Sequence, residues 1–159
     1  MGGMTADPES QAAAPVAQPT GIHHVRLTVT DIARSKAFYT QVLGSPPAVD
    51  FSDQAGDPEV REDQFRLYGG CVFLVGQQVV GLRPVAPAGD RFESTRVGLD
   101  HLSLLVGSAE ALDEAAARLE AAGIAHGSVT ELAGFGLRIL SLQDPDDINL
   151  ELTAAVTAG

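Results

Sequence analysis

The chain has 159 residues, of which 45% are hydrophobic and 19% are charged, a composition typical of a globular protein that can bury its own core. Its formal net charge of −11 has the wrong sign for binding a phosphate backbone, so we expect no nucleic-acid partner. No apolar run reaches the roughly 18 residues that a membrane span requires, so we expect no membrane partner either.

Residues 1–20 differ in composition from the rest of the chain. They are rich in Ala, Pro, Gln, Ser and Gly and show no apolar periodicity, which predicts a flexible leader. They also lack the basic start and the apolar run of a secretory signal. The single cysteine, Cys71, lies in the apolar stretch CVFLV, where a buried thiol is expected. These features favour a cytoplasmic protein that folds over residues 21–155.

The folded part of the chain contains an internal repeat. The segment GIHHVRLTV, which starts at Gly21, aligns with GLDHLSLLV, which starts at Gly98, and this places His24 on His101. In each copy the strand-like segment precedes a helical pattern that begins after a capping residue and ends at a glycine. The capping residues are Asp31 and Ser108, and the terminal glycines are Gly44 and Gly123.

Strand-like patterns follow each helix. We expect strands near 48–51, 64–68 and 71–75 in the first half, and at 124–129, 137–142 and 148–153 in the second. Gly69-Gly70 predicts a tight turn, and Asp144-Pro145-Asp146-Asp147 predicts a type I turn. The sequence therefore predicts one α+β domain of two βαβββ modules, at about 21–80 and 98–153, with a Pro-rich linker at 83–97. We expect the paired modules to form a cupped mixed β-sheet with the helices on its outer face.

Strand alternation places three ionisable residues, His24, His101 and Glu151, away from the aliphatic faces of their strands. If the two sheets curl around one cup, these side chains converge inside it. Two imidazoles and a carboxylate are costly to desolvate alone, and a divalent metal ion such as Fe(II), Zn(II) or Mn(II) satisfies them. A lone histidine on a strand is more often a surface or packing residue, and we expect this of His23. The matching positions of His24 and His101 in the repeat favour a metal site instead.

Four polar residues are candidates for contacting a substrate beside this site. Arg26 shares the strand face of the first histidine and is suited to hold a carboxylate or phosphate, with an ion pair to a neighbouring acid as an equal alternative. Ser103 and Asn149 lie on the same faces as the second histidine and the glutamate. His126 has a side chain suited to acid–base work, against the alternative of a surface residue at a strand end.

Three segments, HHVRLTVTDIARSKAFYTQVLG, GLDHLSLLV and LQDPDDINLEL, resemble the vicinal oxygen chelate superfamily. This group includes glyoxalase I, extradiol dioxygenases, fosfomycin-modifying enzymes and bleomycin-binding proteins. The resemblance covers residues 21–153 and implies the paired βαβββ fold, a homodimer, and one divalent ion (Fe, Mn, Zn or Ni) held by His24, His101 and Glu151. The fourth ligand, Glu or Gln, that glyoxalase I carries late in its first module is absent, because Phe73 or Leu74 stands there.

The sequence thus predicts a metal-dependent, glyoxalase-like enzyme that acts on a small oxygen-rich metabolite by lyase, isomerase or dioxygenase chemistry. The alternative is a metal-free protein that binds or sequesters a small molecule, as the bleomycin-binding relatives do. Aromatic residues make up only 5% of the chain and tryptophan is absent, which disfavours a groove for stacking. The sequence leaves open whether the modules pair within one chain or swap between two chains.

Overall fold

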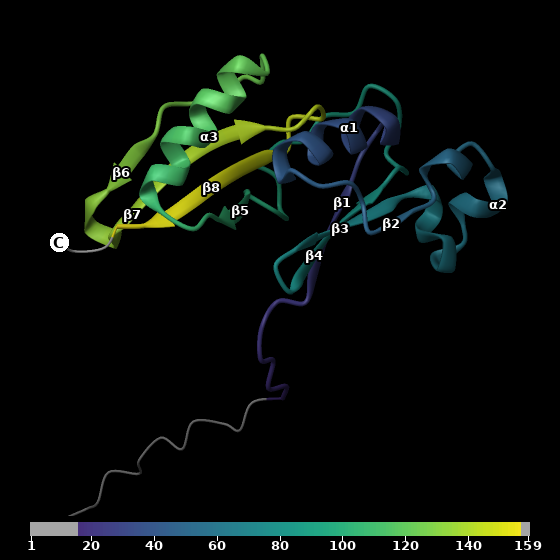
Figure 1. The fold of residues 1–159 in the computed structure, drawn as a ribbon. Coiled ribbons are helices and arrows are strands. Elements are labelled where there is room, and N and C mark those ends of the chain that lie inside the picture. Colours follow the sequence, from purple (N-terminus) through teal and green to yellow (C-terminus); the bar gives the residue numbers. More distant parts are fainter. Residues whose placement is uncertain (1–15, 157–159) are drawn as a thin grey trace, which may run out of the picture.

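The computed structural model describes residues 16–156, so most of the predicted leader at 1–20 lies outside the described residues. Each half of the chain folds into a strand, a helix and three further strands (Figure 1). The first module contains β1 (His24–Thr28), α1 (Ile32–Leu43), β2 (Val49–Asp50), β3 (Cys71–Val75) and β4 (Gln78–Arg83), and the second contains β5 (Leu102–Leu105), α3 (Ala109–Ala121), β6 (Thr130–Leu132), β7 (Leu137–Gln143) and β8 (Asn149–Ala155). The β2–β3 connection also carries the short helix α2 (Pro58–Arg61) and 3-10 turns at Ser52–Gln54 and Gln64–Gly69, and the β6–β7 connection carries one at Ala133–Phe135.

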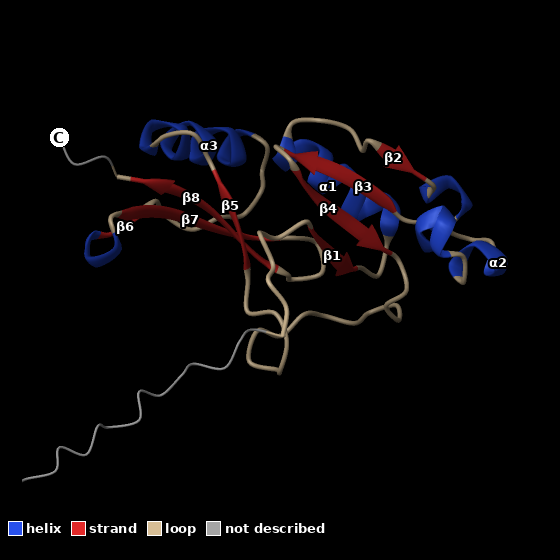
Figure 2. Ribbon diagram, turned by 90° about the horizontal axis from the view of Figure 1, so that it is seen from below, coloured by secondary structure: helices blue, strands red, loops and turns tan. Residues whose placement is uncertain are grey.

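The strands form two four-stranded mixed sheets, in the orders β1-β4-β3-β2 and β5-β8-β7-β6. In each sheet the first strand of the module runs parallel to its last strand, and the other pairs are antiparallel. Both modules therefore have one topology, which confirms the α+β fold and the βαβββ order. α1 packs on the first sheet and α3 on the second, and Figure 2 shows α1 behind the strands of its sheet. Each sheet is left with one helix-free face, and β1 and β5 are edge strands.

The two long helices begin and end where the sequence predicts. The Asp31 carboxylate accepts a hydrogen bond from the backbone N of Arg34 at the start of α1, and the Ser108 hydroxyl accepts one from the backbone N of Ala111 at the start of α3. α1 ends at Gly44, whose φ of 75° favours glycine. These caps satisfy backbone groups that helix ends leave unpaired. No helix within residues 16–156 is both long and apolar enough to cross a bilayer.

Two of the predicted strands are wrong, and one strand was not predicted. Residues 64–68 form a 3-10 turn, because the Asp63 carboxylate accepts a hydrogen bond from the backbone N of Phe65 and starts the turn. Residues 124–129 form only an isolated bridge at His126, and the strand begins at residue 130. The strand that was not predicted is β4, which pairs with both β1 and β3. Gly81 interrupts its apolar run, so the sequence gives no clear strand pattern there.

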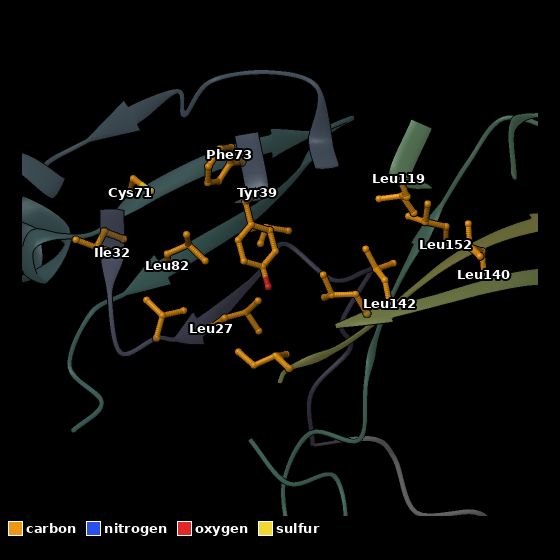
Figure 3. Packing of buried hydrophobic residues seen from close by; sticks show 14 of the residues in the cluster. Leu27, Ile32, Tyr39, Cys71, Phe73, Leu82, Leu119, Leu140, Leu142 and Leu152 are labelled. Atoms are coloured by element: carbon orange, nitrogen blue, oxygen red, sulfur yellow. The ribbon is translucent and has the colours of Figure 1, made fainter. Parts of the chain in front are cut away.

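One apolar core connects the two modules (Figure 3). Tyr39 of α1 is 1% exposed and lies between leucines of the first module and Leu142 of the second. Its ring is tilted against that of Phe73, with 6.3 Å between the ring centroids. Burial of residues from both modules against one tyrosine favours their packing as a unit.

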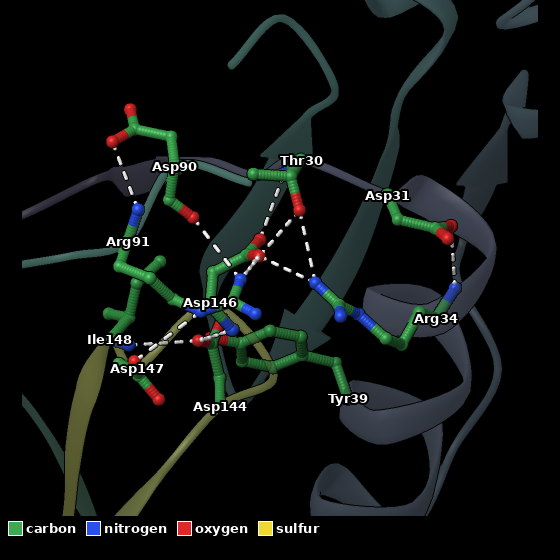
Figure 4. Close-up of polar contacts among 10 residues, drawn as sticks. All are labelled: Thr30, Asp31, Arg34, Tyr39, Asp90, Arg91, Asp144, Asp146, Asp147 and Ile148. Atoms are coloured by element: carbon green, nitrogen blue, oxygen red, sulfur yellow. Dashed lines mark hydrogen bonds and ion pairs between the residues drawn. The ribbon is translucent and has the colours of Figure 1, made fainter. Parts of the chain in front are cut away.

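A buried polar cluster at the β7–β8 turn also joins the modules (Figure 4). The hydroxyl of Tyr39 donates to the Asp144 carboxylate at 2.9 Å. The Asp146 carboxylate accepts hydrogen bonds from the backbone N and the hydroxyl of Thr30, at 2.8 and 2.6 Å. The backbone N of Asp147 donates to the carbonyl of Asp144, which agrees with the predicted turn. The aspartates of this turn therefore bind the first module as well as shape the hairpin.

Candidate functional site

The helix-free faces carry the polar residues that strand alternation predicts. In β1, Leu27 is buried, whereas His24, Arg26 and Thr28 are exposed. In β8, alternate residues are buried in the same way, and Glu151 is half-buried on the opposite face. The parity of these strands therefore places the predicted ligands on faces that no helix covers.

His101 and Glu151 lie together on the second sheet. Ser103 of β5 is the register partner of Glu151 of β8. The Ser103 hydroxyl donates to Glu151 Oε1 at 3.0 Å, and the Thr153 hydroxyl donates to the same oxygen at 2.9 Å. Both hydrogen bonds fix the carboxylate, and neither involves Oε2. One oxygen of the glutamate thus keeps its lone pairs for a ligand.

Asp100 orients the imidazole of His101. The distance from His101 Nδ1 to the Asp100 carboxylate is 2.6 Å, so Nδ1–H donates and Nε2 is left as the outward nitrogen. This hydrogen bond raises the pKa of His101, and the charge of Glu151 raises it further. A carboxylate behind a histidine is the arrangement that fixes the tautomer of a metal-binding imidazole.

His24 stands on the first sheet and has its own orienting neighbour. Its Nδ1 lies 2.9 Å from Nδ1 of His23, and the two rings meet edge to face. One of the two nitrogens donates to the other, and Nε2 of His24 takes no part in the hydrogen bond. His23, which the sequence suggests is only structural, therefore contacts the predicted ligand directly.

Within one chain, the predicted ligands form two separate half-sites: His24 alone, and His101 with Glu151. No group of three or more His, Cys, Asp or Glu residues within residues 16–156 is placed to hold a metal ion. A hollow of about 680 Å³ is lined by His101 and Glu151 but not by His24. The chemistry of the donors nevertheless fits a divalent ion, because each of the three side chains has one atom oriented by a neighbour and one left over.

Three of the four predicted substrate contacts gather at the second half-site. The Ser103 hydroxyl donates to Glu151, so it holds the predicted metal ligand in place. Asn149 and His126 line the same hollow, and the side chain of His126 is 14% exposed. Arg26 lies apart from them, on the first sheet beside His24.

One neighbour of Arg26, the side chain of Arg83, was missed by sequence reasoning. The guanidinium groups of Arg83 and Arg26 lie 3.7 and 5.8 Å from the ring centroid of Tyr68. Arg83 was missed because β4 was not recognised as a strand. The available signal was the run VVGLR after Gly76-Gln77, which places Arg83 on the face opposite Leu82.

A family model described as Glyoxalase/Bleomycin resistance protein/Dioxygenase superfamily matches residues 21–152. The chain belongs to this superfamily. YaeR of Escherichia coli (strain K12), described as uncharacterized, is 30% identical over 139 residues, which make up 82% of this chain and 93% of YaeR. A glyoxylase/bleomycin resistance protein/dioxygenase domain from Frankia sp. EAN1pec is 31% identical, with a TM-score of 0.69 and coverage of 89% of this chain and 96% of that one.

More distant members share the fold. The fosfomycin resistance protein FosX from Listeria monocytogenes is 18% identical, with a TM-score of 0.64 and coverage of 88% of this chain and 95% of FosX. A mutant of FosX has been solved in complex with Mn(II) and 1S,2S-dihydroxypropylphosphonic acid. The superfamily therefore contains a protein that binds a divalent metal together with a small oxygen-rich molecule. At this level of identity the likeness to FosX shows the fold alone.

Proposed function

We propose that the protein is a divalent-metal-dependent enzyme of glyoxalase type that acts on a small oxygen-rich metabolite. In this proposal, the site is completed between two protomers of a homodimer. His24 of one protomer joins His101 and Glu151 of its partner. One observation carries the proposal. Both half-sites lie on helix-free faces and each has an orienting hydrogen bond, yet the described residues of one chain do not bring the two half-sites together.

The edges of the sheets support pairing between protomers. Among the described strands, β1, which carries His24, pairs only with β4, and β5, which follows His101, pairs only with β8. Large apolar side chains are also exposed on the open faces, with Leu74 of β3 at 59% and Leu105 of β5 at 79%. Free strand edges and exposed leucines favour association with another surface. A second copy of the chain supplies that surface with closed two-fold symmetry.

The residues of the two half-sites have distinct tasks in this proposal. The ion, when bound, would polarise oxygens of the substrate and stabilise charge that develops on them. Asp100 keeps a proton on Nδ1 of His101 and so presents Nε2 as the donor. His126 directs Nδ1 to the carbonyl of Gly127 at 2.7 Å, and its Nε2 is buried 3.5 Å from the Glu120 carboxylate, so no nitrogen of His126 is left free to exchange a proton with a substrate.

The chemistry is best matched by a lyase or isomerase that works through an enolate. Three protein ligands leave coordination positions for two substrate oxygens, and FosX combines a metal with a dihydroxy compound in the same fold. Iron as the resident metal would direct the assignment to extradiol-type ring cleavage instead.

The test measures the metal content of the wild-type protein and of single-residue variants. We expect wild-type protein purified without chelators to hold a divalent metal at near one per chain. His24→Ala and Glu151→Gln should each lose it, because two remaining ligands bind weakly. His126→Ala is the matched control, since it removes an imidazole outside the ligand set and should retain the metal.

Co-expression of two differently tagged variants tests the division of the site between protomers. A heterodimer of His24→Ala with His101→Ala contains one intact site and one with neither histidine. With random pairing, about half of the dimers are heterodimers, and each heterodimer has one intact site of its two. We therefore expect the mixture to recover about a quarter of the wild-type metal content. No recovery in isolated heterodimers would place the whole site within one chain. Wild-type protein that holds no metal and takes up none would overturn the enzyme proposal and favour a metal-free binding protein.

A further inference from the structure

Two arginines on the first sheet differ from the other basic residues of this acidic chain. The chain has ten Lys and Arg residues, and within residues 16–156 seven of them form ion pairs with carboxylates. Arg61 instead donates to the carbonyl of Pro84. Arg26 and Arg83 have neither kind of partner among the described residues. The two unpaired cations therefore require an explanation other than an ion pair.

Arg26 and Arg83 project from neighbouring strands onto the same helix-free face. β1 and β4 run in parallel register, with Arg26 beside Gly81 and Thr28 beside Arg83. A Cβ at Gly81 would lie 3.5 Å from Nε of Arg26, so the arginine crosses β4 over the glycine. Both guanidinium groups reach the ring of Tyr68, at 3.7 Å for Arg83 and 5.8 Å for Arg26. Two like charges thus share one aromatic neighbour.

The segment that holds Tyr68 is fitted closely to β4. Leu67 and Tyr68 have φ values of 51° and 58°, which non-glycine residues rarely adopt. The chain then approaches β4 so closely that a Cβ at Gly70 would lie 1.9 Å from the carbonyl oxygen of Leu82. The unusual backbone therefore places the tyrosine ring against Arg83 as part of the fold.

One donor of this cluster is buried without a partner. Nε of Arg83 is inaccessible to solvent and forms no hydrogen bond within the described part of the chain. Buried donors are normally satisfied, and an orphan donor points to a group that is missing from the site. A guanidinium that stacks on an aromatic ring still has its N–H edge available for a planar or tetrahedral oxyanion.

We propose that Arg26 and Arg83, stacked on Tyr68, bind an oxyanion group of the substrate, a carboxylate or a phosphoryl group. The identification of this ligand as the substrate rests on the proposed function, because His24 lies two residues before Arg26 on the same strand face. The substrate is accordingly an anionic metabolite: its oxygens reach the metal, and its charged group reaches the two arginines. In a chain with a net charge of −11, this local pair of cations is what attracts such a group.

The test uses the full chain after removal of metal, so that it does not depend on the metal site. ¹⁵N-labelled protein is titrated with inorganic phosphate and, separately, with acetate at constant ionic strength. We expect saturable shifts of the Arg83 Nε–H resonance and of the Tyr68 ring. Arg83→Met and Arg26→Met keep much of the side-chain length and should each weaken binding by about tenfold or more. Tighter binding of phosphate assigns a phosphoryl group, and tighter binding of acetate assigns a carboxylate.

Arg118→Met is the control for net charge. Arg118 is exposed and pairs with Glu114 on α3, so its loss should leave anion binding unchanged. Absence of shifts with both anions, or equal binding by Arg83→Met and wild type, would overturn the inference and leave the arginines as packing residues. Failure of anion binding would leave the metal content of the protein unchanged. Failure of the proposed function would instead appear as a protein that binds no metal but still shows these anion-induced shifts.

Discussion

The two modules share a topology but present different chemistry on their open faces. The first offers His24, a tyrosine ring and two arginines that have no carboxylate partner within residues 16–156. The second offers His101 and Glu151, surrounded by hydroxyl groups and an aspartate. The repeated part of the sequence places a histidine at the same point of both modules. What surrounds each histidine comes from residues that are not repeated.

The difference between the modules is greatest in the connection before the penultimate strand. In the first module this connection runs from residue 51 to residue 70 and packs its last residues against β4. In the second it is the short turn at Ala133–Phe135, where Gly134 has open space around it. A repeated frame therefore tolerates both a long, closely packed connection and a short, open one, and the long one brings the ring of Tyr68 to the arginines of the first sheet.

Alanine at Gly70 should have the largest effect on this difference. The new Cβ would meet the carbonyl oxygen of Leu82 at 1.9 Å, which forces the backbone of the connection away from β4. We expect a loss of about 3 kcal/mol or more in the free energy of unfolding, measured by urea denaturation. Gly134→Ala is the matched change in the second module and should alter stability by less than about 1 kcal/mol. Similar stability of the two variants would show that the connections are packed alike.

The contact between the modules should be weakened by Tyr39→Phe. The Tyr39 hydroxyl donates to Asp144 in a buried setting, and hydrogen bonds to charged groups contribute about 1.5–3 kcal/mol. We expect a loss of that size at neutral pH in denaturant unfolding. Tyr68→Phe removes the only other tyrosine hydroxyl of the chain and should cost less than about 0.5 kcal/mol. Equal losses would argue against a special role for the Tyr39–Asp144 bond.

The penalty of Tyr39→Phe should also depend on pH. Burial raises the pKa of Asp144, while hydrogen bonds from the turn and from Tyr39 act in the opposite direction. Because the pKa in the folded state is raised, ionisation of Asp144 opposes folding, and this cost disappears as pH falls through that pKa. The variant lacks the donor that favours the ionised form. Its deficit relative to wild type should therefore be greatest above the pKa and should shrink on acidification.

The smallest effect concerns Cys71, which occurs in the first module only. Burial, together with the nearby charge of Asp50, raises the pKa of this thiol to about 12, so the reactive thiolate is scarce at neutral pH. A thiol reagent should label native protein very slowly and label protein in concentrated guanidinium chloride at once. Gly70→Ala should accelerate native-state labelling, whereas Gly134→Ala should not. Rapid labelling of wild type would contradict the buried setting.

Much of the fold follows from local sequence signals. Alternation in β1 and β8 assigned the faces of His24 and Glu151, because a buried aliphatic stripe fixes strand parity. Asp31 and Ser108 marked the helix starts through cap hydrogen bonds between residues three apart. The turn at 64–68 resembles a strand in the sequence, because Phe65 and Leu67 alternate with polar residues, while the Asp63 cap selects a 3-10 turn.

The contacts that join the site to the rest of the molecule were not predictable in this way. The partners Tyr39 and Asp144 are more than a hundred residues apart, and the stack of Tyr68 on Arg83 depends on a rare backbone conformation. The relative placement of the two sheets has no local signal at all. Strand alternation therefore predicted the sheet faces on which the predicted ligands lie. The structure was needed to show that these ligands lie in two separate half-sites within one chain.

The free edges of β1 and β5 have a consequence for a chain that has not yet formed the proposed dimer. Each edge presents backbone N–H and C=O groups that no other strand of the described chain satisfies, as do the shorter edge strands β2 and β6. A newly folded protomer is therefore open to strand addition at these edges. Formation of the proposed dimer competes with strand addition by any other extended segment. A high local concentration of folded copies favours the dimer. An excess of partly folded chains over folded copies would therefore favour aggregation.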